Sequence, residues 1–243
     1  MDPSSALRTM PSAINFQPAV LYGYQRIYNL VSISGIRSGL SNLDTREMAA
    51  LSIRKSCDEN DRVMGCVFEI PQSDLAAYFD REHRYKPMEV SISILSTAAD
   101  GTCSSSSSSY SSVWTVIQQS DEEYQRSMSS EEFRERVLQY YDGQLWGRSD
   151  IFPMRSYSND VIAAAYKLGG STWVENLLLC TRLADEERTL IDYYIMFRDR
   201  VSLENKEIVV ACIGDSSTSS ENEHEVVAVA VGEPSSWIPI SKL

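Results

Sequence analysis

Alternating apolar and polar residues predict β-strands along the first half of the chain. The alternation covers residues 23–31, 62–71 and 88–95, as expected of strands that bury one face. A fourth strand, 113–117, is expected to pair back on 88–95 to form a hairpin. The serine run 104–109 lies between these two strands, so we interpret it as a mobile hairpin loop, with a phosphorylation platform as the alternative.

Helical periodicity and capping signals dominate the part of the chain that follows. Ser129 is predicted to cap a helix, and Glu132, three residues later, completes a capping box. Three further helices are expected over residues 159–168, 172–182 and 185–197. Gly169 and Gly170 are expected to end the first of them, because glycine favours helix ends. Strands followed by helices indicate an α+β fold, with helices packed around a mixed sheet.

The last part of the chain has a different pattern. Two apolar runs, 208–213 and 226–231, predict the strands of an added β-hairpin around the polar stretch 215–224. An exposed hydrophobic pair would aggregate, so these strands are expected to cover a sheet edge or to pair with another subunit, unless they come from a gene-model error. We therefore divide the chain into a domain at 1–200 and a C-terminal extension at 201–243.

Composition and charge limit the classes of function. With 243 residues and 43% hydrophobic composition, the chain is long enough to bury about 70% of its unfolded surface in one core. The net charge of −12 argues against nucleic acid and anionic membranes as partners, since both repel an acidic protein. No apolar run approaches the roughly 20 residues of a membrane span, and the start shows no signal-peptide pattern, so a cytoplasmic protein is expected. These numbers leave the oligomeric state open.

Cysteine and histidine provide little material for a metal site. The five cysteines show no C-x-x-C spacing, and they suit free thiols in a reducing compartment. They are Cys57, Cys66, Cys103, Cys180 and Cys212. The two histidines are His83 and His224, so neither a metal centre nor a cofactor is predicted. A Cys-His nucleophilic pair with His83 as the base is the alternative to a plain solvated imidazole.

One carboxylate is distinguished by its position rather than by its type. Glu82 lies in a short polar connection between an amphipathic segment and the strand that begins near Met88. A general base there could reach a substrate while rigid elements hold it, although most glutamates in such a connection are solvated surface charges. Arg81 and Arg84 flank the acid and would favour its charged form if they approach it, whereas burial would favour the neutral form.

Three segments, taken in order, resemble a known enzyme family. They read GYQRIYNLVS at 23–32, RVMGCVFEIP at 62–71 and DLAAYFDREHRYKPMEV at 74–90. This order resembles the γ-glutamylcyclotransferase family, whose members carry a GYRRVFN-like strand, a VWGVLY-like strand and a helix that ends in an acid-rich turn. The likeness covers about residues 1–198, and it implies a mixed sheet or small barrel with helices around it and a helical C-terminal part.

The resemblance places Glu82 on the family's catalytic glutamate. It implies an enzyme that cyclises the γ-glutamyl group of glutathione, or of other γ-glutamyl peptides and amines, and releases 5-oxoproline. The substrate's own α-amine attacks its γ-carbonyl, so the folded conformer supplies most of the proximity effect. A carboxylate transfers the proton and fixed N–H donors hold the oxyanion, which requires neither metal nor cofactor. Tyr85 matches a family tyrosine that bonds the substrate or positions the base, with an ordinary core tyrosine as the alternative.

The chain departs from the family at its beginning. Residues 1–13 resemble the segment that follows a glycine-containing loop in relatives, and that loop supplies substrate-binding N–H groups. We therefore expect one strand and its loop to be missing, with unpaired strand neighbours and marginal stability as the consequence. Either the start codon is assigned too late or the pocket is incomplete. The competing functions are a catalytically impaired binding module on the same fold and a structural protein that associates through its C-terminal strands.

Overall fold

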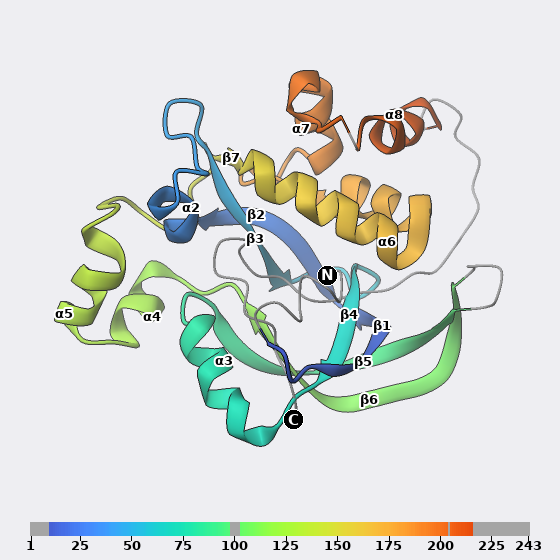
Figure 1. The fold of residues 1–243 in the computed structure, drawn as a ribbon, viewed down its shortest axis with the longest axis horizontal. Helices are drawn as coiled ribbons and strands as arrows, with labels where there is room; N and C mark the ends of the chain where they lie inside the picture. The colour runs from blue at the N-terminus through green and yellow to red at the C-terminus, as the bar shows by residue number, and fades with distance from the viewer. Residues whose placement is uncertain (1–9, 98–102, 204, 216–243) are drawn as a thin grey trace.

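Two four-stranded β-sheets form the centre of the structure, and helices lie around them (Figure 1). The computed structural model describes residues 10–97, 103–203 and 205–215. The first sheet has the strand order β4-β1-β5-β6, and neighbouring strands in it are antiparallel. Its strands are β1 (Ile14–Tyr22), β4 (Arg62–Glu69), β5 (Lys86–Thr97) and β6 (Cys103–Ile117).

The second sheet is mixed, because two short strands flank a long antiparallel pair. β2 (Tyr24–Val31) pairs antiparallel with β3 (Glu47–Lys55). The short strands β7 (Phe152–Pro153) and β8 (Thr181–Arg182) pair in parallel with β3 and β2, respectively. Mixed strands with surrounding helices confirm the α+β class that the order of elements predicts.

The two sheets meet in a curled, half-barrel arrangement (Figure 1). β1 leads into β2 through Gly23, whose φ of 72° lies in the left-handed region that glycine adopts without strain. The Gly23 N–H donates to the carbonyl of Asp61 over 2.7 Å, which ties this corner to the start of β4. The N–H of Gln118, just after β6, donates to the carbonyl of Ile53 in β3 over 2.8 Å. These bonds connect the second sheet to both edge strands of the first.

Short helical segments gather beside the first sheet and at the ends of β2 and β6 (Figure 1). They are α2 (Ile33–Arg37), the 3₁₀ turn η1 (Gln72–Asp74), α3 (Leu75–Arg81), α4 (Asp121–Arg126), α5 (Ser130–Phe133) and the π-helical turn η2 (Arg134–Leu138). α3 connects β4 to β5, and it is this connection that carries Glu82. α4 starts with a full capping box between Ser120 and Glu123, which stabilises the first turn of a short helix.

Three helices of the described residues lie beside the second sheet, the longest packed on it and the other two packed on that helix. They are α6 (Arg155–Cys180), α7 (Leu190–Met196) with the 3₁₀ turn η3 (Arg198–Arg200), and α8 (Lys206–Asp215). Figure 1 shows α6 lying across β2 and β3, with α7 and α8 on its outer side. Gly169 and Gly170 take non-helical backbone angles inside α6 and bend it, so the predicted helix break at these glycines is confirmed.

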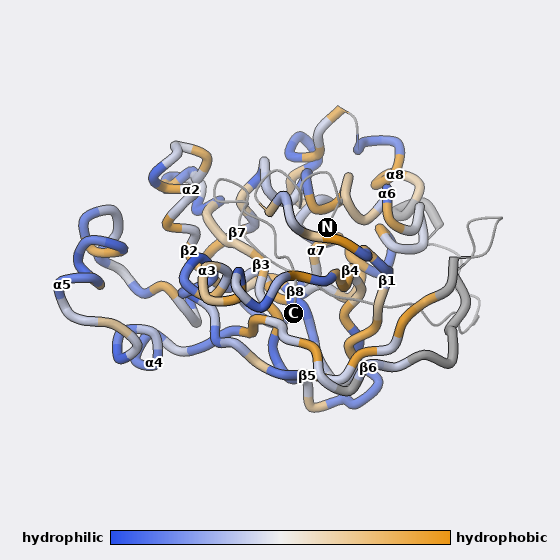
Figure 2. Tube along the Cα trace, turned by 60° about the horizontal axis from the view of Figure 1, so that its bottom comes forward, coloured by the Kyte–Doolittle hydropathy of each residue, from blue (hydrophilic) through white to orange (hydrophobic). Residues whose placement is uncertain are grey.

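Hydrophobic side chains from the strands and from α6 form one continuous core. Tyr28 and Ile53 in the second sheet and Val174 in α6 are fully buried. Figure 2 shows hydrophobic stretches along the central strands, whereas the α4 and α5 region is mostly hydrophilic. The strands are therefore held by burial, and the short helices at their ends depend more on caps and polar contacts.

The serine run does not form the expected loop. Residues 104–109 belong to β6, and their backbone pairs with β5, where Ser105 lies opposite Leu95. Main-chain hydrogen bonds need no apolar side chain, so β5 serves as a template for a strand with little hydrophobic signal of its own. The prediction of a hairpin between β5 and β6 is correct, and its connecting residues 98–102 lie outside the described residues.

The first strand expected in the C-terminal extension is wrong. Residues 208–213 lie in α8, where Val209 is 1% exposed and its neighbour Val210 is 64% exposed. Burial of one helix face against α6 therefore outweighs the strand propensity of a β-branched run. The second expected strand, 226–231, lies outside the described residues, and the division of the chain at residue 200 stays a prediction.

The predicted cap at Ser129 is confirmed, but only half of its capping box forms. The Ser129 Oγ accepts the N–H of Glu132 over 3.2 Å, as an N-cap side chain should. The Glu132 carboxylate does not return to the cap and instead lies 3.0 Å from Nε of Arg136, one helical turn further on. Arg136 therefore binds the carboxylate that the sequence pattern predicts to bond the N-cap residue.

Candidate functional site

Glu82 lies where the sequence predicts, between a helix and a strand. It is the C-cap residue of α3, and its N–H donates to the carbonyl of Tyr78 over 2.9 Å. Its own carbonyl accepts the N–H of Tyr85 over 2.8 Å, which forms the turn into β5. The backbone at Glu82 is therefore fixed by hydrogen bonds on both sides.

The Glu82 side chain is buried, unlike the solvated charges that are usual in such a connection. The residue is 4% exposed, and its Oε1 lies 2.8 Å from Nη1 of Arg81. Because unpaired buried charges are costly, this burial requires the carboxylate and the guanidinium to stay together. Of the two flanking arginines, Arg81 forms an ion pair with the acid.

Tyr85 is a buried residue of the same turn. It is 2% exposed, and its hydroxyl donates to the carbonyl of Leu51 in β3 over 3.1 Å. Its ring meets Trp146 edge to face, with 5.6 Å between the ring centroids. Tyr85 therefore joins the turn to the second sheet, and its hydroxyl already has a main-chain partner.

His83 is held by α4 rather than solvated as the sequence suggests. Its Nδ1 lies 2.8 Å from the hydroxyl of Tyr124, and the two rings are stacked. Burial, followed by the positive charges of Arg84 and Arg136, lowers the pKa of His83 to about 3. The amide of Gln119 also donates to the carbonyl of Arg84 over 2.8 Å. These contacts brace the Glu82 turn from the side of α4, and they leave His83 neutral at physiological pH.

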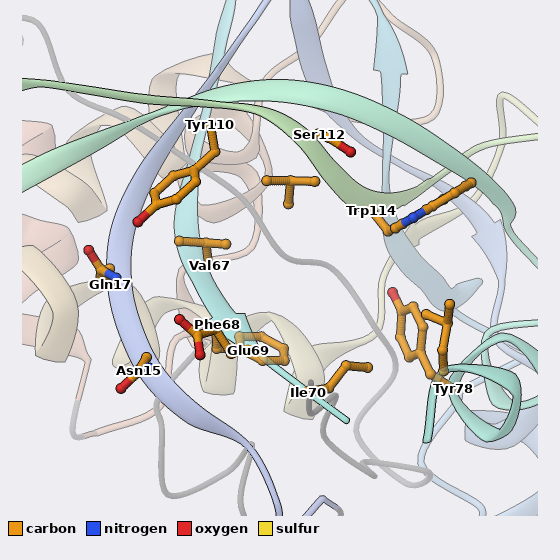
Figure 3. Close-up of a pocket in the computed structure, with 12 residues that line it drawn as sticks. Asn15, Gln17, Val67, Phe68, Glu69, Ile70, Tyr78, Tyr110, Ser112 and Trp114 are labelled. Carbon is orange, nitrogen blue, oxygen red and sulfur yellow. The ribbon is translucent and has the colours of Figure 1, made fainter. Parts of the chain in front are cut away.

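A cavity of about 250 Å³ opens between β1, β4, β6 and α3 (Figure 3). Most of its wall is apolar or aromatic, and a smaller part is polar. It is lined by Asn15, Gln17, Val67, Phe68, Glu69, Ile70, Leu75, Tyr78, Tyr110, Ser112, Val113 and Trp114. None of these residues is predicted as a site residue from the sequence. They come from segments that are distant in the chain, so no local sequence motif predicts the cavity.

Tyr78 relates this cavity to Glu82. It lies one helical turn before Glu82 in α3, is 4% exposed and lines the cavity. Burial raises the pKa of Tyr78 well above its ordinary value, the charge of Glu82 raises it further, and Arg81 opposes this effect. The Tyr78 hydroxyl is therefore close enough to Glu82 to sense its charge, while the Glu82 carboxylate is not part of the cavity wall.

A second, more polar cavity of about 420 Å³ lies near the ends of β2 and β6. Asn29 and Gln118 line it and are joined by a hydrogen bond of 2.7 Å, and the hydroxyl of Ser52 donates to Asn29 over 2.6 Å. The Asp121 carboxylate accepts the N–H of Trp146, which packs on Tyr85. This cavity borders the Glu82 turn through Gln119, which donates to the carbonyl of Arg84, and several of its polar side chains hydrogen-bond within the protein.

The described residues contain no group of three or more His, Cys, Asp or Glu side chains that could hold a metal ion. Cys57, Cys66 and Cys180 are free thiols. Burial raises the pKa of Cys66 and of Cys180, which keeps both as thiols at neutral pH. Within the same residues, no helix has the length and apolar character to cross a membrane.

The structure brings Glu82, Tyr85 and His83 together in one braced turn. It adds Arg81 as the partner of the acid, and Tyr78 as the residue that faces the neighbouring cavity. The chain matches no protein-family model and no curated protein. The site must therefore be interpreted from its own geometry and from the residues around Glu82.

Proposed function

We propose that the protein is a γ-glutamylcyclotransferase-like enzyme that cyclises the γ-glutamyl group of glutathione or of γ-glutamyl peptides and amines. Glu82 is the general acid/base, and the products are 5-oxoproline and the released amine. The observation that carries the proposal is the buried, ion-paired carboxylate of Glu82 at the end of α3. A solvated surface glutamate needs neither burial nor a fixed cation, whereas a positioned proton carrier benefits from both.

The reaction requires one proton carrier. The α-amine of the substrate attacks its γ-carbonyl carbon, a C–N bond forms, and the existing C–N bond to the leaving amine then breaks. The α-ammonium loses two protons on becoming the ring N–H, and the leaving nitrogen takes up two to depart as an ammonium, so one carboxylate that carries them in turn suffices and no redox step occurs. A substrate α-ammonium would compete with Arg81 for Glu82, since both are cations that a carboxylate binds at short range.

Tyr85 has a supporting place in this proposal. Its hydroxyl bonds to Leu51, so it holds the Glu82 turn against β3 and would have to leave that carbonyl to contact a substrate. No cofactor is required, and the partner is a small molecule rather than a nucleic acid or a membrane. The free thiols of Cys57, Cys66 and Cys180 support a reducing, cytoplasmic setting.

The second candidate is a binding module on the same fold. It is favoured by the low exposure of both predicted site residues, 4% for Glu82 and 2% for Tyr85, and by the protein partners that each side chain already has. On this alternative, the Arg81–Glu82 pair fixes the turn and performs no proton transfer. The two candidates differ in a measurable product.

The test is release of 5-oxoproline from glutathione and from γ-glutamyl amino acids by the purified protein. We expect turnover by the parent and a loss of about 100-fold or more in the Glu82→Gln variant, the usual effect of a proton-transfer group. Asp80→Asn is the matched control, because Asp80 lies two residues before Glu82 at the end of α3 with a 72% exposed side chain. A Glu82→Gln variant as fast as the parent would sink the assignment. Binding of these compounds without 5-oxoproline would support the binding module instead.

A further inference from the structure

The cavity between β1, β4, β6 and α3 has two chemically different sides. Figure 3 shows the polar side chains of Asn15, Gln17 and Glu69 on one side, near the rings of Phe68 and Tyr110, and Tyr78 with Trp114 on the other. Phe79 of α3 stacks edge to face on Trp114, with 5.7 Å between centroids, so the aromatic side has a fixed wall. A cavity with an aromatic side and an opposite polar side selects ligands that carry both characters.

The aromatic side contains a hydroxyl without a partner among the described residues. Tyr78 as a whole is 4% exposed, its hydroxyl makes no hydrogen bond to the described residues, and it points into the cavity in Figure 3. Because burial raises the pKa of Tyr78, this hydroxyl keeps its proton and can donate. A ligand with an acceptor at that end would give this donor a partner inside the cavity.

The polar side contains a solvent-exposed carboxylate, that of Glu69. Glu69 lines the cavity at the end of β4, and no cation of the described residues forms an ion pair with it. Asn15 lies on the same side of the cavity, at a β-bulge of the paired strand β1, where the register shifts between Ile14 and Gln17 and the φ of Asn15 is 54°. β-Bulges often lie beside binding sites, where they change the direction of a side chain. The left-handed backbone of Asn15 is uncommon for a residue other than glycine, and such residues also concentrate at binding sites.

We propose that this cavity binds a small aromatic ammonium compound with a ring hydroxyl, of the 4-hydroxyphenylalkylamine class. The ammonium group lies at Glu69, where the amide oxygens of Asn15 and Gln17 also accept. The ring packs on Trp114, and its hydroxyl accepts from Tyr78. A volume of about 250 Å³ suits a ligand of about ten non-hydrogen atoms. The net charge of −12 attracts cations to the protein as a whole. This site is separate from the proposed reaction, because Glu82 takes no part in it.

The experiment is isothermal titration calorimetry of the full chain with tyramine at low ionic strength. We expect a Kd on the order of 1 mM or tighter, since ligands of this size reach that affinity with a few good contacts. 3-(4-Hydroxyphenyl)propionate, which replaces the ammonium by a carboxylate, should bind at least about tenfold more weakly. Phenethylamine, which lacks the ring hydroxyl, should lose about three- to tenfold. Equal affinity for the cation and the anion, or no binding of tyramine, overturns the proposal.

Two variants locate the ligand. Glu69→Gln should weaken tyramine binding about fivefold, as expected for loss of a partly solvated ion pair. Tyr78→Phe should erase the difference between tyramine and phenethylamine, because only the hydroxyl is removed. Glu59→Gln is the control, since it makes the same change of net charge at an exposed turn outside the cavity. If Glu59→Gln weakens binding as much as Glu69→Gln, or if neither cavity variant changes it, the ligand does not occupy this cavity.

Discussion

Glu82 and Arg81 depend on each other for their burial, with 2.8 Å between their charged atoms. Breaking a buried ion pair leaves one charge without compensation, at a typical cost of about 3–5 kcal/mol. A Glu82→Gln variant therefore removes one ion pair of Arg81 as well as the proposed base. The rate of this variant must therefore be measured at a temperature where the variant is folded, as its melting temperature shows.

His83 makes the stability of the protein sensitive to mildly acidic pH. Burial lowers the pKa of His83 from 6.5 in an unfolded chain to about 3. Below pH 6.5, His83 therefore binds a proton in the unfolded state but stays neutral in the folded state. The contribution of neutral His83 to the free energy of unfolding is complete above pH 6.5 and is lost as the pH falls towards 3. Between pH 7.5 and 5.5, His83 should lower the free energy of unfolding by about 1 kcal/mol.

Urea unfolding of the parent and of a His83→Gln variant at these two pH values measures this contribution. The variant lacks the titrating ring, so its loss of stability over the interval should be about 1 kcal/mol smaller than that of the parent. His224 is present in both proteins and cancels in the difference. Identical losses in the two proteins would show that His83 is protonated in the folded state.

Glu82 could be placed from sequence, but its environment could not. The amphipathic segment that ends before Glu82 and the alternating strand that begins near Met88 locate the turn between a helix and a strand. Its pairing with Arg81 and its burial depend on how α3 packs, which no local pattern encodes. The same holds for the cavity, where Asn15 and Trp114 are about a hundred positions apart in the chain.

At the scale of elements, the bend in α6 depends on Gly170. Its φ of 66° and ψ of −154° lie in a region that is essentially restricted to glycine. Gly170→Ala should therefore reduce the free energy of unfolding by about 1–3 kcal/mol, although alanine is the better helix former. Chemical denaturation measures the change. Ser171→Ala, at the next exposed position, is the control and should change stability by less than about 0.5 kcal/mol.

A more stable Gly170→Ala variant would contradict this account. It would mean that α6 straightens when glycine is removed, because a continuous helix gains about 1 kcal/mol from alanine over glycine. The ring of Trp173 already packs on Gly169, where an added Cβ would come within 1.9 Å of it. Straightening would thus have to move a residue that is only 3% exposed.

The strands differ in how clearly the sequence predicts them, although β2, β3 and β4 all contain runs of consecutive buried residues. β2 and β4 place polar residues among the apolar ones and are predicted, whereas β3 has no period of two in its sequence and is not predicted. β1 was missed because its bulge and Pro18 interrupt the pattern. Residues 208–213 show the reverse error, since a short apolar run does not distinguish a strand from a helix that packs on α6.

At the scale of the whole molecule, the excess of acidic residues should make stability depend on salt. The chain has 34 acidic and 22 basic residues, and such an imbalance destabilises the compact state through self-repulsion. Raising NaCl from about 10 mM to about 300 mM shortens the screening length severalfold. If about 1 kcal/mol of repulsion is relieved, the melting temperature should rise by about 2–4 °C.

Differential scanning calorimetry at the two salt concentrations tests this expectation. KCl is the control for a specific sodium effect and should produce the same rise. A fall in melting temperature with both salts would show that attractive pairs, such as the one between Lys86 and Glu123, outweigh the repulsion.

The serine-rich half of β6 has a consequence for the behaviour of concentrated protein. β6 ends the strand order of the first sheet, so this part of its backbone pairs with β5 on one side in the described residues. An edge strand of this kind can template fibrils when its residues are apolar and interlock in dry layers. A run of six serines offers main-chain hydrogen-bonding groups but little hydrophobic surface that a second sheet could bury. Little free energy is therefore gained when an ordered aggregate grows from this edge.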